Sequence, residues 1–456
     1  MTKPLIFNFF AMVAPSHAAT GIWRRPDSRT LDYTQIDLWV DLAKLAERGK
    51  VDAIFFADQF GMSEGPWNLV IENALHFPNG DPSVFLSAMA YAAREVGFIF
   101  TSSVMQQHPY TFARTASTLD HLTRGRLGWN VVTSPSSRAA KAMGMEGSAD
   151  HDERYRWAEE YISLTYQLWE GSWEDGAVIR DRERGLYADP AKVHAIRHHG
   201  QRYRVEGPHL AEPSPQRTPV IFQAGSSTAG MAFAGRHAEG VFIVSGSPEA
   251  AAKKVAALRQ AAIDQGRSPG DLVILEGVTV VVGATMEEAR RKERECEACV
   301  NHDVVVQQLA GMARIDVSHY APTTPLAEVM AQSQGIRSIL DMVIDTMPPG
   351  EVATVNDLLH YSARKMRIVG TPESVCDQLA AYAAAGVDGF NLMYLFMPGT
   401  FDDFVDQVAP ILQRRGLMKS AYTPGTLREK LFARGARVPP SHPAHRCRIT
   451  PADRDA

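Results

Sequence analysis

The hydrophobic positions of the chain form short, nearly continuous runs, and longer amphipathic stretches separate them. Apolar runs rich in β-branched and aromatic residues are typical of strands that are buried on both faces of a sheet. The stretches between them, such as residues 34–50 and 109–123, have helical periodicity. The expected strands are residues 5–13, 52–58, 96–104, 126–134, 218–225, 240–246, 272–282 and 388–394.

Eight strands that alternate with helices predict an α/β fold, a (β/α)8 TIM barrel. A doubly wound sheet is the alternative. No Gly-x-Gly-x-x-Gly follows the first strand, which weakens a dinucleotide-binding interpretation.

Two intervals between expected strands are too long for ordinary connections. Residues 135–217 follow the fourth strand and residues 284–370 follow the seventh, and we expect both insertions to shape or cover a pocket. The sequence therefore predicts a single barrel domain over residues 1–417. Residues 418–456, rich in Arg, Pro and Ser, predict an arm that packs on a neighbour or a partly disordered tail.

Composition narrows the class of protein. The chain has 456 residues, of which 45% are hydrophobic and 22% charged, as in soluble globular proteins. No apolar run reaches the roughly 18 residues of a membrane helix, and the apolar N-terminus predicts a first strand, not a signal peptide. A net charge of −5 without a long basic run makes nucleic acid an unexpected partner. We expect a cytoplasmic protein.

The four cysteines predict neither a disulfide framework nor a metal centre. Cys296 and Cys299 form a Cys-x-x-Cys with His302 nearby, but a structural zinc site needs a second pair of similar spacing. Cys376 and Cys447 do not supply it. We therefore expect reduced thiols and no metal.

Polar residues end several of the expected strands. The run "RGRLGWNVVTS" carries Asn130 inside an apolar strand and ends on hydroxyls. Asp58, residues 101–103 and residues 223–227 stand at comparable places. One such end is adequately explained as a turn or helix cap. Four of them favour a shared site, because the carboxyl ends of barrel strands build the active site.

Four groups of residues could bind a ligand. Asp58 could accept a hydrogen bond from a cofactor ring, or cap the next loop. His151 and Tyr155, spaced i and i+4, share a helix face that could bind a phosphate, although the spacing by itself favours an ordinary surface pair. The turn "QAGSSTAG", with Ser226 and Ser227, opens a helix and favours an anion, although a serine cap explains it too. His17, after the first strand, could exchange a proton with a reacting group, or lie on the surface.

Several segments together resemble one protein family. They include "DHLTRGRLGWNVVTS", "HDERYRWAEEYISLTYQLWEGSWEDGAVIRD", "YADPAKVHAIRHHG", "GPHLAEPSPQRTPVIFQAGSS" and "RIVGTPESVCDQLAAYAAAGVDGFNLM". In this order they are similar to the nitrilotriacetate, dibenzothiophene-sulfone and long-chain-alkane monooxygenase group, within the bacterial-luciferase-like flavin monooxygenases. The resemblance extends over residues 5–415.

The resemblance implies a flavin-dependent monooxygenase that uses reduced FMN (FMNH2) from a separate flavin reductase. One atom of O2 enters a small organic substrate through a C4a-(hydro)peroxyflavin, and the other leaves as water. It also implies a homodimer or homotetramer. The protein would hold the flavin, exclude water and place the substrate.

The resemblance also implies roles for individual residues. His17 matches a histidine on the substrate side and is the expected catalytic residue. The expected cofactor-binding residues are Asp58, Ser103, Asn130, His151, Tyr155, Ser226 and Ser227. Where some relatives carry other residues in the first-strand loop, this chain has Ala11, Ala14 and Thr20. Residues 61–82 also depart from the family pattern. We expect both stretches to line the substrate pocket, so no relative's substrate is assigned to this chain.

Two other functions remain open. A deazaflavin-dependent oxidoreductase of the same barrel superfamily is one, although "GWNVVTS" and "HDERY" favour the FMN group. A non-catalytic flavin-binding protein is the other, and oxygen-dependent consumption of a substrate would separate it from a monooxygenase.

Overall fold

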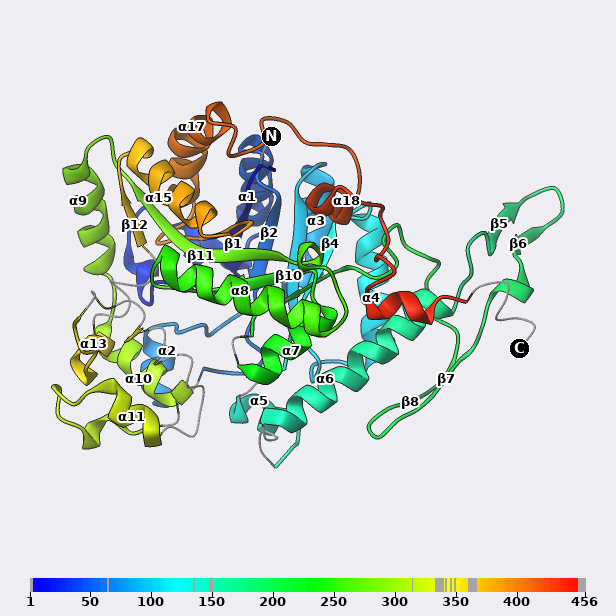
Figure 1. Cartoon of the computed structure of the whole chain (residues 1–456), viewed down its shortest axis with the longest axis horizontal. Coiled ribbons are helices and arrows are strands. Elements are labelled where there is room, and N and C mark those ends of the chain that lie inside the picture. Colours follow the sequence, from blue (N-terminus) through cyan, green and yellow to red (C-terminus); the bar gives the residue numbers. More distant parts are fainter. Residues whose placement is uncertain are drawn as a thin grey trace.

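A closed parallel barrel forms the centre of the molecule (Figure 1). The computed structural model describes residues 3–63, 65–133, 136–146, 151–225, 227–313, 315–332, 340, 343–344, 347, 350–359 and 367–449. Around the barrel the strands follow the order β1-β2-β3-β4-β9-β10-β11-β13, and β13 pairs with β1 to close it. Their bounds are β1 Ile6–Met12, β2 Ala53–Ala57, β3 Gly97–Ser103, β4 Leu127–Val132, β9 Val220–Gln223, β10 Gly240–Ile243, β11 Val273–Val282 and β13 Gly389–Met393. The predicted TIM barrel, with each of its eight strands, is confirmed.

Aromatic side chains from alternate strand positions fill the barrel. The ring of Phe10 on β1 lies 5.3 Å from that of Phe55 on β2 and 5.0 Å from that of Phe242 on β10, centroid to centroid. Phe222 on β9 lies 5.7 Å from Phe55. Because inward-facing residues alternate along each strand, this layer is a packed core beneath the carboxyl ends of the strands.

Helices cover the outside of the barrel, as the alternating pattern predicts. The principal ones are α1 Ile36–Arg48, α3 Leu86–Ala92, α4 Pro109–Leu122, α7 Thr228–His237, α8 Pro248–Asp264, α15 Pro372–Ala384, α16 Gly399–Asp403 and α17 Ala409–Arg414. Short α2, Trp67–Glu72, lies in the connection after β2. In the described part of the chain, no helix is both long and apolar enough to cross a membrane.

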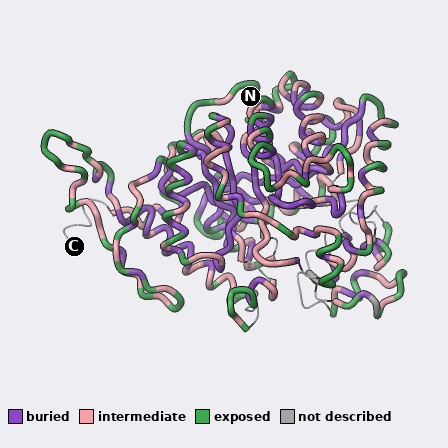
Figure 2. Tube along the Cα trace, turned by 180° about the vertical axis from the view of Figure 1, so that it is seen from behind, coloured by how far each residue is buried: buried purple, intermediate pink, exposed green. Residues whose placement is uncertain are grey.

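The insertion after β4 contains α5, Ser137–Ala142, and the long helix α6, His151–Tyr166, which continues as a π-helical turn over Gln167–Gly171. Two antiparallel hairpins follow, β5 Val178–Asp181 with β6 Leu186–Ala188, and β7 Ile196–His199 with β8 Arg204–Gly207. Figure 2 shows these hairpins extending away from the buried centre, with many exposed residues.

The insertion after β11 is mostly helical in its described part. It contains α9 Met286–Glu297, α10 His302–Ala313, α11 Leu326–Gln332 and α13 Val355–Leu359. A ninth parallel strand, β12 Arg367–Gly370, pairs with the far end of β11, where Thr279 lies opposite Arg367. Four residues are too few to stand out within a long helical excursion, and the sequence did not predict this strand.

Residues 417–449 pack across the amino end of the barrel, where the strands begin. The Leu5 amide, just before β1, donates to Leu417 at 2.8 Å. The Tyr422 hydroxyl donates to the carbonyl of Val51 before β2, at 2.7 Å. Helix α18, Leu427–Phe432, contacts the residues just before β3, β4, β9 and β10. The segment predicted as an arm or tail thus lies, as far as residue 449, on the chain's own barrel.

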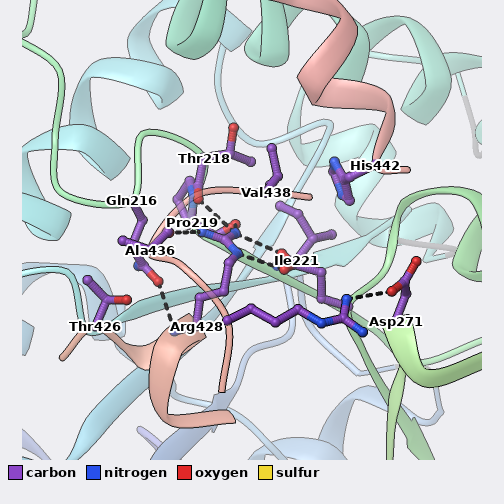
Figure 3. A network of polar contacts seen from close by, with 12 residues as sticks. Gln216, Thr218, Pro219, Ile221, Asp271, Thr426, Arg428, Ala436, Val438 and His442 are labelled. Atoms are coloured by element: carbon purple, nitrogen blue, oxygen red, sulfur yellow. Dashed lines mark hydrogen bonds and ion pairs between the residues drawn. The ribbon is translucent and has the colours of Figure 1, made fainter. Parts of the chain in front are cut away.

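Arg428 of α18 is the centre of this packing (Figure 3). Its side chain is 1% exposed and forms an ion pair with Glu239 at 2.7 Å. It also donates to the carbonyls of Thr218, Pro219 and Ala436. Burial alone would raise the pKa of Glu239, but the guanidinium beside it holds that pKa below its usual range. The amino end is therefore closed by a satisfied buried ion pair.

Candidate active site at the carboxyl end of the barrel

Asn130 lies inside the barrel near the carboxyl end of β4, with 6% of its surface exposed. Its side-chain amide donates to the Thr101 hydroxyl at 2.9 Å, and that hydroxyl donates to the Phe56 carbonyl at 2.8 Å. This chain of donors fixes the orientation of the amide. The Oδ1 atom then points away from these partners, and it has no hydrogen-bond partner among the described residues. A buried acceptor of this kind is suited to an N–H or O–H group of a ligand.

Tyr155, Gln223 and Ser227 meet at the first turn of α7. Tyr155 of α6 is hydrogen-bonded to the side chains of Ser227 and Gln223, and burial raises the pKa of its phenol. Ser227 caps α7 and accepts the Gly230 amide at 3.1 Å. A Cβ atom on Gly230 would lie 2.7 Å from the Tyr155 hydroxyl, so the phenol is pressed against the helix terminus. Amide N–H groups and a phenol gathered at a helix N-terminus form a setting suited to an anion.

Gln223, at the end of β9, adds a second buried acceptor. It is 4% exposed, and its Oε1 atom has no partner among the described residues. Gln223 lies opposite Val131 in the strand register, one residue beyond Asn130. Gln223 lies in the polar turn predicted from the sequence, but it was not predicted as a site residue. An amide oxygen at a strand end was the available signal.

Asp58 directly follows β2 and faces the same end of the barrel. Its Oδ1 atom accepts the Gln59 amide at 2.8 Å and the Asn79 side-chain amide at 3.0 Å. Burial raises the pKa of Asp58 to about 7, and the neighbouring carboxylate of Asp81 acts in the same direction. The two hydrogen bonds oppose that shift. Asp58 can therefore hold or release a proton near neutral pH.

His17 lies beyond β1, on the side of the site opposite α7 and Tyr155. Its ring centroid is 4.9 Å from that of Phe10 inside the barrel, 5.7 Å from that of Tyr394 and 6.1 Å from that of His76. These rings form an aromatic wall with two imidazoles. His17 was predicted from the sequence, whereas His76 was not.

Ser103 ends β3 and is 1% exposed. Its hydroxyl oxygen accepts the Met105 amide at 3.2 Å, as a local turn requires. Ser226 and the side chain of His151, both predicted to bind the cofactor, lie outside the described residues. The other predicted site residues form three groups around one barrel end, near His17 and Asp58, near Ser103 and Asn130, and near Tyr155 and Ser227.

The arginines of the first loop are committed to structural contacts. Arg24 donates to the Cys299 carbonyl. Arg25 forms an ion pair with Asp27 at 2.6 Å and lies 4.3 Å from the ring of Phe396. Its Nη1 atom is 3.5 Å from the Cys296 sulfur, and burial raises the pKa of that thiol to about 11. Within the described ranges, no group of three or more His, Cys, Asp or Glu residues could hold a metal ion.

The donor and acceptor pattern fits FMN. The N-terminal turn of α7 with Tyr155 and Ser227 would hold the phosphate. The acceptor oxygens of Asn130 and Gln223 would face hydroxyl or N–H donors of the ribityl chain and ring, and Asp58 would lie on the ring side. Each of these groups would supply the donor or acceptor that complements the corresponding part of FMN.

Comparison with known proteins decides the family. The family model for luciferase-like monooxygenases matches residues 16–389. The chain belongs to the luciferase-like monooxygenase family. This result confirms the family predicted from the sequence and identifies an enzyme of the flavin-dependent monooxygenase class.

This luciferase-like monooxygenase is similar over nearly its whole length to two named relatives and to one solved structure. Long-chain alkane monooxygenase of Geobacillus thermodenitrificans is 40% identical, over 98% of this chain and 99% of its own length. Dimethyl-sulfide monooxygenase of Hyphomicrobium sulfonivorans is also 40% identical, over 97% of this chain and 94% of its own. A structure of riboflavin lyase with modified FMN and riboflavin superposes with a TM-score of 0.91 at 34% identity, over 98% of this chain and 100% of its own.

Proposed function

We propose that this luciferase-like monooxygenase is a two-component enzyme that uses FMNH2 supplied by a separate flavin reductase. It would insert one atom of O2 into a small organic substrate and release the other as water. Reduced flavin supplies the electrons that activate O2, and the protein holds the flavin, excludes water and places the substrate.

The observation that carries the proposal is the pair of buried acceptors at neighbouring strand ends. The amide oxygens of Asn130 and Gln223 have no partner among the described residues, and leaving a buried polar group unsatisfied costs about 1–3 kcal/mol. A ligand that brings donors to both atoms removes that cost. The riboflavin lyase structure, with its modified FMN, supports a flavin as this ligand.

We assign the cofactor-binding roles accordingly. Asp58, Ser103 and Asn130 would contact the ring and its surroundings, and Gln223 joins them. The phosphate and ribityl contacts would come from His151, Tyr155, Ser226 and Ser227. His17 would face the substrate, where an imidazole can donate or accept a proton.

The substrate is a small organic molecule that the aromatic wall can accept. The two relatives with 40% identity are named for a long-chain alkane and for dimethyl sulfide, and equal identity favours neither chemistry. We further propose a cytoplasmic homodimer or homotetramer. All four cysteines are free, which is compatible with a reducing compartment.

Isotope labelling tests the oxygenase function. The purified protein would be loaded anaerobically with FMNH2, mixed with ¹⁸O2, and offered a long-chain alkane or a dialkyl sulfide. We expect one ¹⁸O atom in the product and none when a reductase-free mixture contains only oxidised FMN. Oxidation of FMNH2 at the rate of free flavin, with no labelled product from either substrate, would contradict the proposal.

A further inference from the structure

His76 joins the loop after β2 to the loop after β1. Its Nε2 atom lies 3.0 Å from the backbone carbonyl oxygen of His17, and its Nδ1 atom lies 3.3 Å from the Oε1 atom of Gln59. Gln59 in turn donates its backbone N–H to Asp58. One imidazole thus connects the residue proposed to face the substrate with the loop that carries the carboxylate of the cofactor side.

Two of the contacts of His76 bear on the protonation of its ring. A carbonyl oxygen only accepts, so the nitrogen that faces His17 must carry a hydrogen. The Gly61 carbonyl orients the Gln59 amide, because it accepts from the Nε2 atom at 2.9 Å. The Ser63 hydroxyl lies near both amide atoms, 2.9 Å from Nε2 and 3.2 Å from Oε1. The oxygen of the Gln59 amide therefore faces His76, and the second ring nitrogen must carry a hydrogen as well. Only the imidazolium form has two N–H groups.

The backbone of His76 has an uncommon conformation. Its φ angle is 49°, in the left-handed region, and nearby Ala74 has a φ of 51°. Residues other than glycine enter this region rarely, and holding one there costs about 1–3 kcal/mol. The loop accepts this strain while directing the imidazole between its two carbonyl partners.

Charged groups of both signs surround the loop of His76. The segment 58–81 contains no lysine or arginine of its own, but Arg138 of α5 donates to the carbonyls of Ser63 and Gly65 within it. Asp58 lies on the far side of Gln59, and Asn79 donates both to Asp58 and to the Gln59 carbonyl. The carboxylate of Asp81 acts on that of Asp58 and raises its pKa further. The other titratable ring beside His76 is that of His17, 6.1 Å away.

We propose that His76 is a positioning residue of this site, held as an imidazolium that ties the loop of His17 to the loop of Asp58. The role rests on the proposed function, in which His17 faces the substrate and Asp58 faces the cofactor. His76 would then set the distance between these two sides of the site. His76 touches neither reacting molecule in this role. It fixes where His17 stands relative to the loop after β2.

The imidazolium can be tested in the resting protein, without cofactor or substrate. Nitrogen NMR of ¹⁵N-histidine-labelled protein would show 15 histidines, and the His76→Asn variant would identify the signal of His76. We expect both ring nitrogens to stay protonated at pH 7, where a free histidine, with a pKa of about 6.5, is mostly neutral. A neutral His76 ring at pH 7 would overturn the proposal.

The positioning role is tested by kinetics with a matched control. Asn tolerates the left-handed backbone, so His76→Asn keeps the loop but cannot span both partners. We expect kcat/KM to fall about tenfold, since small misplacements near a reacting centre have effects of this size or larger. If the imidazolium is required, the wild type should lose kcat/KM at alkaline pH as His76 gives up its proton, and the variant should not show this decline. Binding of oxidised FMN should stay within about twofold of the wild type.

Ala74→Asn is the control, because it changes the same loop at the same backbone conformation and leaves the imidazole in place. It should retain the wild-type kcat/KM and pH profile. Equal losses in the two variants, or no loss in His76→Asn, would overturn the role of His76. Failure of the wild type to bind FMN would instead overturn the proposed function, and the NMR signal of His76 would still decide its protonation.

Discussion

At the amino end of the barrel, Arg428 is buried and all three of its guanidinium nitrogens donate hydrogen bonds to Glu239 or to backbone carbonyls. At the carboxyl end, Asn130 and Gln223 are almost as buried, yet each keeps an oxygen without a partner among the described residues. One end uses buried polar groups to hold the chain to itself. The other leaves them available for the proposed cofactor, so under this proposal the two ends of the barrel serve stability and binding separately.

Among the substitutions that test this contrast, Arg428→Met should cause the largest loss in the free energy of unfolding. The substitution leaves the Glu239 carboxylate buried without its cation, and removal of one partner from a buried pair costs about 3–5 kcal/mol. Chemical denaturation would measure the loss in unfolding free energy. Arg48→Met is the control, because Arg48 pairs with Asp406 on the surface, where both side chains are more than half exposed. Its cost should stay below about 1 kcal/mol, and equal losses in the two variants would contradict the contrast.

Asn130→Leu should weaken the cofactor more than the fold. It removes the acceptor proposed to face FMN, and one lost hydrogen bond, about 1.4 kcal/mol, lowers affinity about tenfold. Fluorescence titration with FMN would measure this change. Stability should fall by no more than about 1.5 kcal/mol, because the side chain makes a single described hydrogen bond, to Thr101.

Gln216→Leu is the matched amide at the opposite end. Its side chain donates to Asp120 and Leu127 and accepts from the Arg428 backbone. This variant should lose more stability than Asn130→Leu and keep the wild-type affinity for FMN. If Gln216→Leu instead weakened FMN binding, or if Asn130→Leu lost more stability, the proposed division of roles between the two ends would be wrong.

The smallest expected effect concerns Asp58 and pH. Its folded pKa, near 7, lies above the unfolded value of about 3.9, so the native state binds the extra proton between these values. Stability contributed by protonated Asp58 is therefore lost as pH rises from about 4 to about 7. Asp58→Asn should gain on the wild type by about 1 kcal/mol over this window, with allowance for partial exposure of the carboxyl. Thermal unfolding at several pH values would show it, and a pH-independent difference would refute it.

The sequence predicted the barrel because its buried strands are long apolar runs, which only a sheet covered on both sides accommodates. Asn130 could be found for the same reason, since an amide inside such a run has few structural uses. β12 could not, because four residues carry too little pattern. The role of His76 depends on a left-handed backbone and on the orientation of Gln59, neither of which is written in spacing or composition.

The packing of residues 417–449 over the starts of the strands has a consequence for the order of events during synthesis. β1 must wait for β13 before the barrel closes, a separation of nearly the whole chain, and the amino end stays open until α18 has been made. While it is being translated, the chain thus has unpaired edges and an unmatched Glu239 carboxylate. Contacts this distant in sequence form slowly, so we expect the nascent chain to expose aggregation-prone edges until α18 has left the ribosome.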